Sequence, residues 1–145
     1  MTQTISSDHL LLSVPQMDSQ HGDLIALVNE FLTAADAGAA RAELEPRLTR
    51  LVRAFQVHFD SEEGLMRANG FPGLTAHADE HRKLIGQMTG LRDSVGSGDV
   101  QICGALVLFV RLWTERHIAG PDRTFAQFLG DGKAGCGSGL LSIGQ

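Results

Sequence analysis

The sequence predicts an all-α protein: an antiparallel up-down-up-down four-helix bundle with an extended N-terminal arm and a short C-terminal helix. Three observations support this fold class. Apolar residues recur at spacings of three and four in four long stretches. Short segments rich in glycine or proline separate these stretches, and short connections favour antiparallel neighbours. No segment shows the convincing alternation of apolar and polar residues that is typical of a half-buried strand.

The first two helices are expected over residues 18–37 and 42–68. Asp18 is the predicted N-cap of the first helix. In the second helix, Pro46 is expected within the first two turns, and Gly70 closes the helix. The apolar stripes of the two helices are Leu24, Ile25, Val28, Phe31 and Leu32, then Leu44, Leu48, Leu51, Phe55, Leu65 and Met66.

The third and fourth helices are expected over residues 72–95 and 99–118. A short loop, GSGD, joins them, and its Asp99 is a candidate cap. The sequence AGPD then breaks the pattern, and Pro121 is expected to open a short closing helix that ends at Phe128. The apolar stripes are Leu74, Leu84, Met88 and Leu91, then Cys103, Leu106, Val107, Val110 and Trp113.

The two ends of the chain differ from the helical stretches. Residues 1–17 include the apolar run LLLSVP and are expected to lie against the bundle as an extended arm. The Gly-rich segment 131–145 is expected to form a flexible tail. The sequence therefore predicts one bundle domain over residues 1–130, followed by this tail.

Composition excludes several classes of protein. A net charge of −5 gives no basic surface for nucleic acid or for an anionic membrane. The longest apolar run, ICGALVLFV, is too short to span a bilayer, and the N-terminus has no pattern of a signal peptide. Two cysteines make no disulfide framework. We therefore expect a cytoplasmic protein that binds neither nucleic acid nor a membrane.

Five of the six histidines fall on the inward stripes of the predicted helices, together with one carboxylate. A single histidine is more often a surface residue or a core residue bonded to a backbone carbonyl. Several buried polar groups together need a common partner, because each is costly to bury alone. Only His9, in the arm, stands apart. The inward set is His21, His58, Glu62, His77, His81 and His117.

Position along the helices brings this set together at one end of the bundle. At ~1.5 Å per residue, His77 and His81 lie within ~13 Å of the start of their helix, and His117 lies near the end of the next. The pair in HADEH is not the zinc-protease motif, because Ala78 stands where that motif has glutamate. Five imidazoles and a carboxylate exceed the four positions of a zinc site and suit two metal ions.

Four motifs in this order resemble the hemerythrin family, specifically its single-domain bacterial members. They are MDSQHGDL, HFDSEEGLM, HADEH and WTERHIAGPD, and the resemblance covers roughly residues 10–128. It implies a di-iron centre in which Asp122 is the seventh ligand. One iron would be held by His77, His81 and His117, and the other by His21 and His58. Glu62, Asp122 and an oxo or hydroxo group would bridge them.

The resemblance also implies the function. We expect reversible binding of dioxygen for carriage, storage or sensing, with an oxygen-consuming enzyme or a redox protein as partner. The alternative is a di-iron enzyme that acts on peroxide or nitric oxide, or an iron donor for repair of metal centres. The implied walls of the oxygen pocket are Phe59, Trp113, Thr114 and Ile118.

Thr114 departs from the family, whose members usually carry leucine directly after the tryptophan. A hydroxyl at this position has two possible roles. It can face the oxygen pocket and assist loss of bound oxygen, or it can bond to a backbone carbonyl of the preceding turn, as helical threonine often does. The sequence leaves both open.

Overall fold

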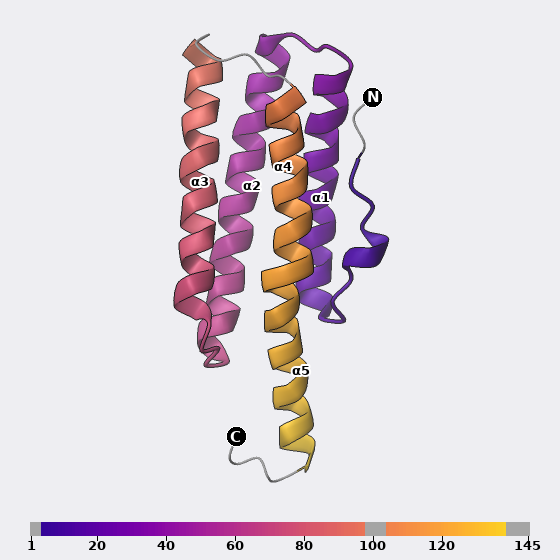
Figure 1. Cartoon of the computed structure of the whole chain (residues 1–145), viewed down its shortest axis with the longest axis vertical. Helices are drawn as coiled ribbons and strands as arrows, with labels where there is room; N and C mark the ends of the chain where they lie inside the picture. The colour runs from indigo at the N-terminus through magenta and orange to yellow at the C-terminus, as the bar shows by residue number, and fades with distance from the viewer. Residues whose placement is uncertain (1–3, 98–103, 139–145) are drawn as a thin grey trace.

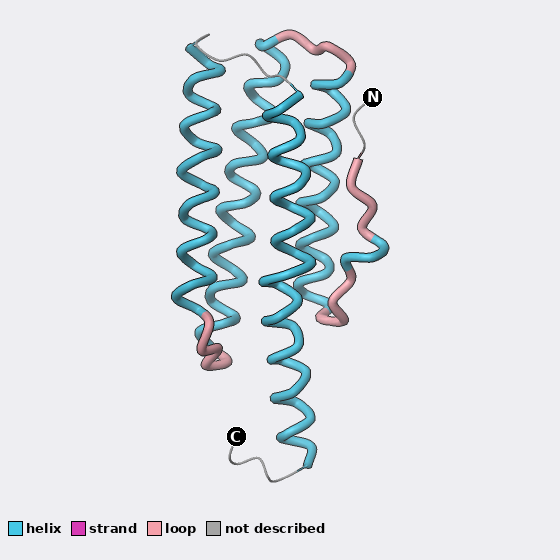
Figure 2. The backbone as a smooth tube through the Cα atoms, in the orientation of Figure 1, coloured by secondary structure: helices cyan, strands magenta, loops and turns pink. Residues whose placement is uncertain are grey.

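The computed structural model describes residues 4–97 and 104–138, and this part of the chain is helical without strands. Four helices run side by side in alternating directions, as Figure 1 shows. Figure 2 shows the loops at the bundle ends and in the N-terminal arm. The predicted four-helix bundle is confirmed. The helices are α1 (Pro15–Asp36), α2 (Arg41–Ala68), α3 (Leu74–Ser97), α4 (Gly104–His117), the π-helical η2 (Ile118–Asp122) and α5 (Arg123–Ser138).

Helix α1 begins three residues before the predicted start. Pro15 is its first residue and Val14 is the N-cap, because proline needs no hydrogen-bond acceptor there and its fixed φ suits a first turn. Asp18 therefore lies inside the helix, and its prediction as N-cap is wrong. Its Oδ1 instead accepts a hydrogen bond from the backbone N–H of Leu12, at 2.8 Å. Asp18 thus fixes the arm to the start of α1.

The N-terminal arm lies along α1, as predicted (Figure 1). The Asn29 side chain accepts the backbone N–H of Ile5 at 2.7 Å and donates to its carbonyl at 2.9 Å. These two hydrogen bonds satisfy the backbone N–H and carbonyl of Ile5, which have no partner strand. The short 3₁₀ turn η1 (Asp8–Leu10) follows, and Leu10 and Leu12 are buried in the core. The arm is therefore part of the packed domain.

The turn between α2 and α3 shows how a glycine positions an aromatic ring. Gly70 has a φ of +64°, which only glycine adopts readily. The chain reverses there, and the N–H of Phe71 reaches the carbonyl of Met66 at 3.0 Å. The ring of Phe71 then packs against Phe125, 5.0 Å between centroids. Gly70 closes α2 as predicted, and Pro46 lies in the second turn of that helix.

Two predicted boundaries in the second half of the chain are too early. Helix α3 continues to Ser97, whose hydroxyl bonds to a carbonyl of the last turn, so half of the predicted loop is helical. Asp99 lies outside the described residues. The closing helix does not end at Phe128 but runs to Ser138. The flexibility of 131–145, and the division of the chain at residue 130, stay predictions.

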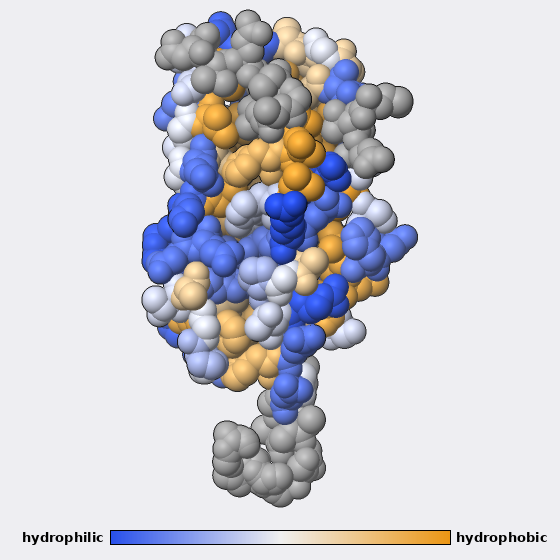
Figure 3. All heavy atoms as spheres, in the orientation of Figure 1, coloured by the Kyte–Doolittle hydropathy of each residue, from blue (hydrophilic) through white to orange (hydrophobic). Residues whose placement is uncertain are grey.

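The predicted stripe of α1 is fully buried, with Val28, Phe31 and Leu32 at 0% exposure. On the other helices Leu65, Leu74 and Leu91 are only half-buried, because they lie at the edges of their stripes. Cys103 and Leu106 fall outside the described side chains. Among the described helices none is long and apolar enough to cross a membrane. Figure 3 shows mixed polar and apolar side chains on one face of the bundle.

Candidate metal centre

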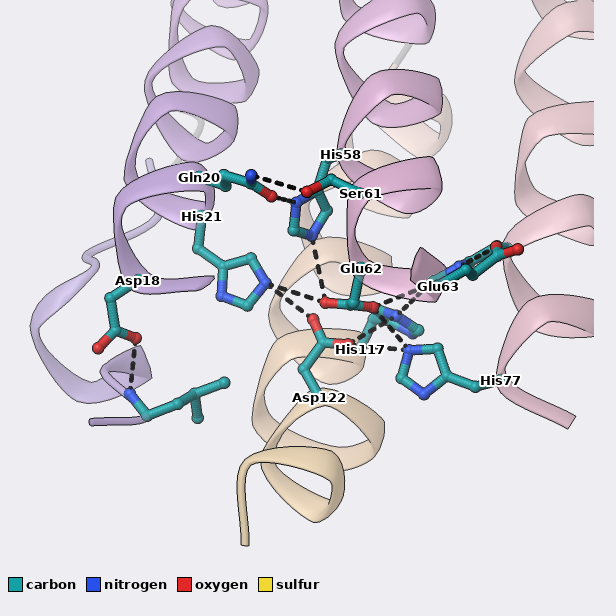
Figure 4. A network of polar contacts seen from close by, with 12 residues as sticks. Asp18, Gln20, His21, His58, Ser61, Glu62, Glu63, His77, His117 and Asp122 are labelled. Carbon is teal, nitrogen blue, oxygen red and sulfur yellow. Dashed lines mark hydrogen bonds and ion pairs between the residues drawn. The ribbon is translucent and has the colours of Figure 1, made fainter. Parts of the chain in front are cut away.

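The seven predicted ligand side chains converge at one end of the bundle. Figure 4 shows six of them directed toward a common centre from α1, α2, α3, the end of α4 and η2: His21, His58, Glu62, His77, His117 and Asp122. Each is at most 5% exposed, whereas His9 is on the surface. The helix ends bring them together because α1 and α3 begin where α2 and α4 end. The seven residues are His21, His58, Glu62, His77, His81, His117 and Asp122.

The two oxygens of Glu62 face different histidines. Oε1 lies 2.9 Å from Nε2 of His77 and 3.2 Å from Nε2 of His81. Oε2 lies 3.4 Å from Nε2 of His58 and 3.7 Å from Nε2 of His21. One carboxylate therefore stands between a group that contains His77 and His81 and a group that contains His21 and His58.

The two oxygens of Asp122 also face different histidines. Its Oδ1 lies 3.0 Å from Nε2 of His77 and 3.1 Å from Nε2 of His117, whereas its Oδ2 lies 2.9 Å from Nε2 of His21. The potential ligand atoms accordingly form two overlapping sets that share both carboxylates. We call them the three-histidine set (His77, His81 and His117) and the two-histidine set (His21 and His58).

A π-helical turn brings Asp122 to the centre. In a regular α-helix, a residue five positions after His117 would lie about 140° around the axis from it. In η2 the N–H of Arg123 bonds to the carbonyl of Ile118, five residues earlier, so the turn takes up one extra residue. His117 and Asp122 therefore share a face. The predicted break at AGPD is wrong, because α4, η2 and α5 form one continuous helix.

The buried polar atoms of the cluster lack the hydrogen-bond partners that such atoms normally have. Both ring nitrogens of His21, Nε2 of His58, Oε2 of Glu62 and both oxygens of Asp122 make no aligned hydrogen bond. In addition, Nε2 of His81 and Nε2 of His117 face each other at 3.0 Å. Buried groups of this kind are costly without a partner. Imidazole nitrogens and carboxylate oxygens aimed at a common centre fit metal ions.

Without metal, the carboxylates hold protons on two of the histidines. Burial alone would lower the pKa of His21 and His77, but close contacts with Asp122 and Glu62 outweigh it and raise both pKa values to about 9. Burial would raise the pKa of Glu62 and Asp122, yet the surrounding histidines hold both well below their usual range. In the metal-free cluster His21 and His77 therefore pair as imidazolium rings with Glu62 and Asp122.

Aromatic rings fix the orientation of two histidines in the three-histidine set. Phe59 stacks on His81 with centroids 3.7 Å apart and planes at 4°, and Trp113 stacks on His117 at 4.4 Å and 13°. Ile118 is buried beside them. A cavity of about 350 Å³, partly lined by Trp113, reaches His117 from the surface. The wall of this cavity is mostly apolar, with Phe109, Leu112, Trp113 and Pro121, but it also includes Glu80 and Arg116.

Thr114 is buried, and its hydroxyl donates a hydrogen bond to the carbonyl of Val110 at 2.8 Å. The sequence left two roles open for this hydroxyl. The structure has the second of them, a hydrogen bond to a carbonyl of the preceding turn.

Sequence reasoning missed the residues that hold the outer nitrogens of two histidines. Gln20 contacts Nδ1 of His58 at 2.9 Å, and Glu63 contacts Nδ1 of His81 at 2.8 Å. Gln20 precedes a candidate ligand and Glu63 follows one, and such adjacency is the signal that could have identified them. Figure 4 shows the amide of Gln20 on α1 facing both His58 and Ser61 on α2.

Comparison with known proteins gives consistent results. The family model of the hemerythrin HHE cation-binding domain matches residues 12–129. Bacteriohemerythrin of Methylococcus capsulatus is 31% identical over 112 residues, covering 77% of this chain and 85% of that protein. Bacteriohemerythrin of Ralstonia nicotianae is 28% identical over 123 residues, covering 85% and 86%. The crystal structure of wild-type hemerythrin superimposes with a TM-score of 0.79 at 28% identity, covering 88% of this chain and 97% of that one.

The matched region contains all seven residues of the cluster and the whole of helices α1 to α4 and η2 as the structure describes them. Sequence and fold agree over most of both chains. The family binds non-heme iron and dioxygen, and the buried cluster of histidines and carboxylates suits a metal. This chain belongs to the hemerythrin family.

Proposed function

We propose that this protein holds two iron ions in the cluster and binds dioxygen reversibly. His77, His81 and His117 would hold one iron, and His21 and His58 the other. Glu62 and Asp122 would bridge them. The observation that carries the proposal is the division of both carboxylates, each with one oxygen toward each histidine set.

The two histidine sets offer unequal numbers of donors. The three-histidine set has one imidazole more than the two-histidine set, while both share the same carboxylates. Iron in the two-histidine set would therefore keep one position free for a small ligand. When bound as iron(II), the pair supplies the two electrons that reversible binding of dioxygen uses.

The surrounding residues favour binding over turnover. Phe59, Trp113 and Ile118 present apolar surface at the centre, and the hydroxyl of Thr114 is occupied by Val110. These four side chains are the proposed oxygen pocket. Apolar walls keep water and external reductants away from the metals, as reversibility requires. We therefore propose a binding protein rather than an enzyme.

Anaerobic loading with iron(II), followed by metal analysis and optical spectroscopy, tests this function. We expect two irons per chain, a new absorption band on exposure to dioxygen, and loss of that band under argon. A reproducible value of one iron would contradict the two-iron assignment. A band that never reverses, with sustained consumption of peroxide or nitric oxide, would identify an enzyme. A cytoplasmic location and an oxygen-consuming or redox partner stay predictions.

A further inference from the structure

One candidate ligand histidine in each set has a polar partner on its outer nitrogen, and the two partners differ in charge. On the three-histidine side, Nδ1 of His81 lies 2.8 Å from Oε2 of Glu63. On the two-histidine side, Nδ1 of His58 lies 2.9 Å from Oε1 of Gln20. Glutamate and glutamine have nearly the same shape. The main difference between these two contacts is therefore a full negative charge.

The contact between Gln20 and His58 has a defined direction. Nε2 of Gln20 donates to Oγ of Ser61 at 3.0 Å, so the amide oxygen is the atom that faces His58. Nδ1 of His58 must then donate its proton, which leaves the lone pair on Nε2 for the centre. That Nε2 lies 3.4 Å from Glu62. Gln20 thus selects the tautomer of His58 that can bind metal.

Glu63 holds His81 in the same orientation. Phe59 stacks on the ring of His81 and fixes its plane, so that Nδ1 faces Glu63 and Nε2 lies 3.2 Å from Oε1 of Glu62. The side chain of Glu63 is 20% exposed, so the contact is only partly screened by solvent. Glu80 lies near Nδ1 of His117, but at 3.5 Å and 53% exposed its influence is smaller.

A carboxylate partner makes a histidine a stronger electron donor to a metal than a neutral amide does. We propose that Glu63 and Gln20 are positioning residues that increase the inequality of the two metal positions beyond the difference in histidine number, with tighter binding and a more electron-rich metal in the three-histidine set. This inference rests on the proposed two-metal function. It adds two side chains outside the ligand set that contribute to the difference between the positions.

The substitution Glu63→Gln tests the carboxylate. Because the side chain keeps its shape, the bundle should fold with unchanged helical circular dichroism. We expect the affinity of one of two bound cobalt(II) ions, measured by chelator competition, to fall 10- to 100-fold. The midpoint potential of the iron-loaded protein should rise. Asp60→Asn is the control, since it removes one negative charge from exposed surface of the same helix, three residues away.

The reciprocal substitution Gln20→Glu tests the amide. We expect tighter binding of the weaker cobalt ion and a lower midpoint potential, opposite in sign to the effect of Glu63→Gln. Gln16→Glu is the control, because it adds the same charge on the exposed side of α1, four residues earlier. A purely structural role would weaken binding in both variants and would not reverse the sign of the potential.

The outcomes separate this inference from the proposed function. If Glu63→Gln matches Asp60→Asn in both affinity and potential, or if both ions weaken equally, the inference is wrong while two-metal binding stands. If the wild-type chain takes up a single ion, the proposed function fails. The ratio of affinities between Glu63→Gln and Asp60→Asn then still decides whether Glu63 acts on the metal.

Discussion

The interiors of the two ends of the bundle differ: one is apolar, and the other is polar and charged. Around Phe31, ~15 Å along α1 from His21, the interior is apolar and close-packed, with Val28, Phe31 and Leu32 completely buried. Around His21 the interior holds five imidazoles and two carboxylates, many without hydrogen-bond partners. The first end gains free energy of folding from burial. The second end depends on positive charge, which protonated His21 and His77 supply in the metal-free protein and metal ions would supply in the loaded protein.

This difference means that stability and metal binding are separable by position. Substitutions at the apolar end should lower the free energy of unfolding equally with and without metal. Substitutions at the cluster should lower the free energy of unfolding more in the loaded protein than in the metal-free protein. The following predictions test that separation.

Phe31→Ala should have the largest effect. Its ring is fully buried, and its removal leaves a cavity, so the free energy of unfolding should fall by about 3–5 kcal/mol. Urea denaturation of the metal-free and the loaded protein should give the same loss. A loss confined to the loaded protein would show that the two ends are not independent.

His77→Ala should remove metal and its stabilisation. With metal at a hundredfold excess over Kd, the wild type gains about 3 kcal/mol that this variant lacks. The metal-free variant should also lose some stability, because His77 is a charged partner of Glu62 and Asp122 in the metal-free cluster. Thermal unfolding with and without iron measures both. His9→Ala is the control, since the side chain of His9 is exposed and belongs to neither histidine set.

The metal-free protein should lose stability at alkaline pH. The pKa values of His21 and His77 are raised from an ordinary 6.5 to about 9 by contacts with the carboxylates. Their stabilising charge is fully present below pH 6.5 and is lost as the pH rises through about 9. We expect a fall of roughly 1–3 kcal/mol between pH 7 and 10. Loaded protein, in which metal replaces those protons, should show little change over this range.

Thr114→Val should have a small effect. The change removes a hydrogen bond to the carbonyl of Val110 and costs about 1 kcal/mol or less. Because the hydroxyl is occupied, the rate at which the oxygenated band decays in air should equal that of the wild type. A slower decay in the variant would mean that the hydroxyl turns toward the pocket when oxygen is bound.

Deletion of all residues after Leu129 should have the smallest effect. Phe125 and Phe128, which pack against Phe71, are retained, and every ligand candidate precedes the deletion. We expect unchanged metal content and an unchanged optical spectrum. A changed spectrum would place part of the tail at the metal centre.

Most of the fold could be predicted because the spacing of apolar residues along the sequence indicates which side chains of a helix are buried. The stripe from Leu24 to Leu32 is buried as predicted, and so are five inward histidines. Helix ends were less accurate. Asp18 has the side chain of a cap, but Pro15 starts the helix earlier, and nothing in the local sequence ranks one signal above the other.

The candidate site was predicted from periodicity except at Asp122. A regular helix places that residue on another face than His117, and Pro121 suggests that the helix stops. Neither expectation includes a π turn, so only the resemblance to the family pointed to Asp122. Gln20 and Glu63 were missed because they touch imidazole atoms that face outward, and inward stripes do not select such residues.

The extra residue in η2 also sets the direction in which every later side chain of this helix points around the helix axis. Phe125 and Phe128 meet Phe71 only because the helix has been rotated by the π turn before they are reached. A one-residue deletion at Ala119 would place Asp122 four positions after His117, about 40° around a regular helix, so Asp122 and these rings would keep nearly the same faces without a π turn. A one-residue insertion would instead turn them away from their partners. Length is therefore constrained in one direction, and homologous chains should tolerate loss of one residue in this segment more readily than gain of one.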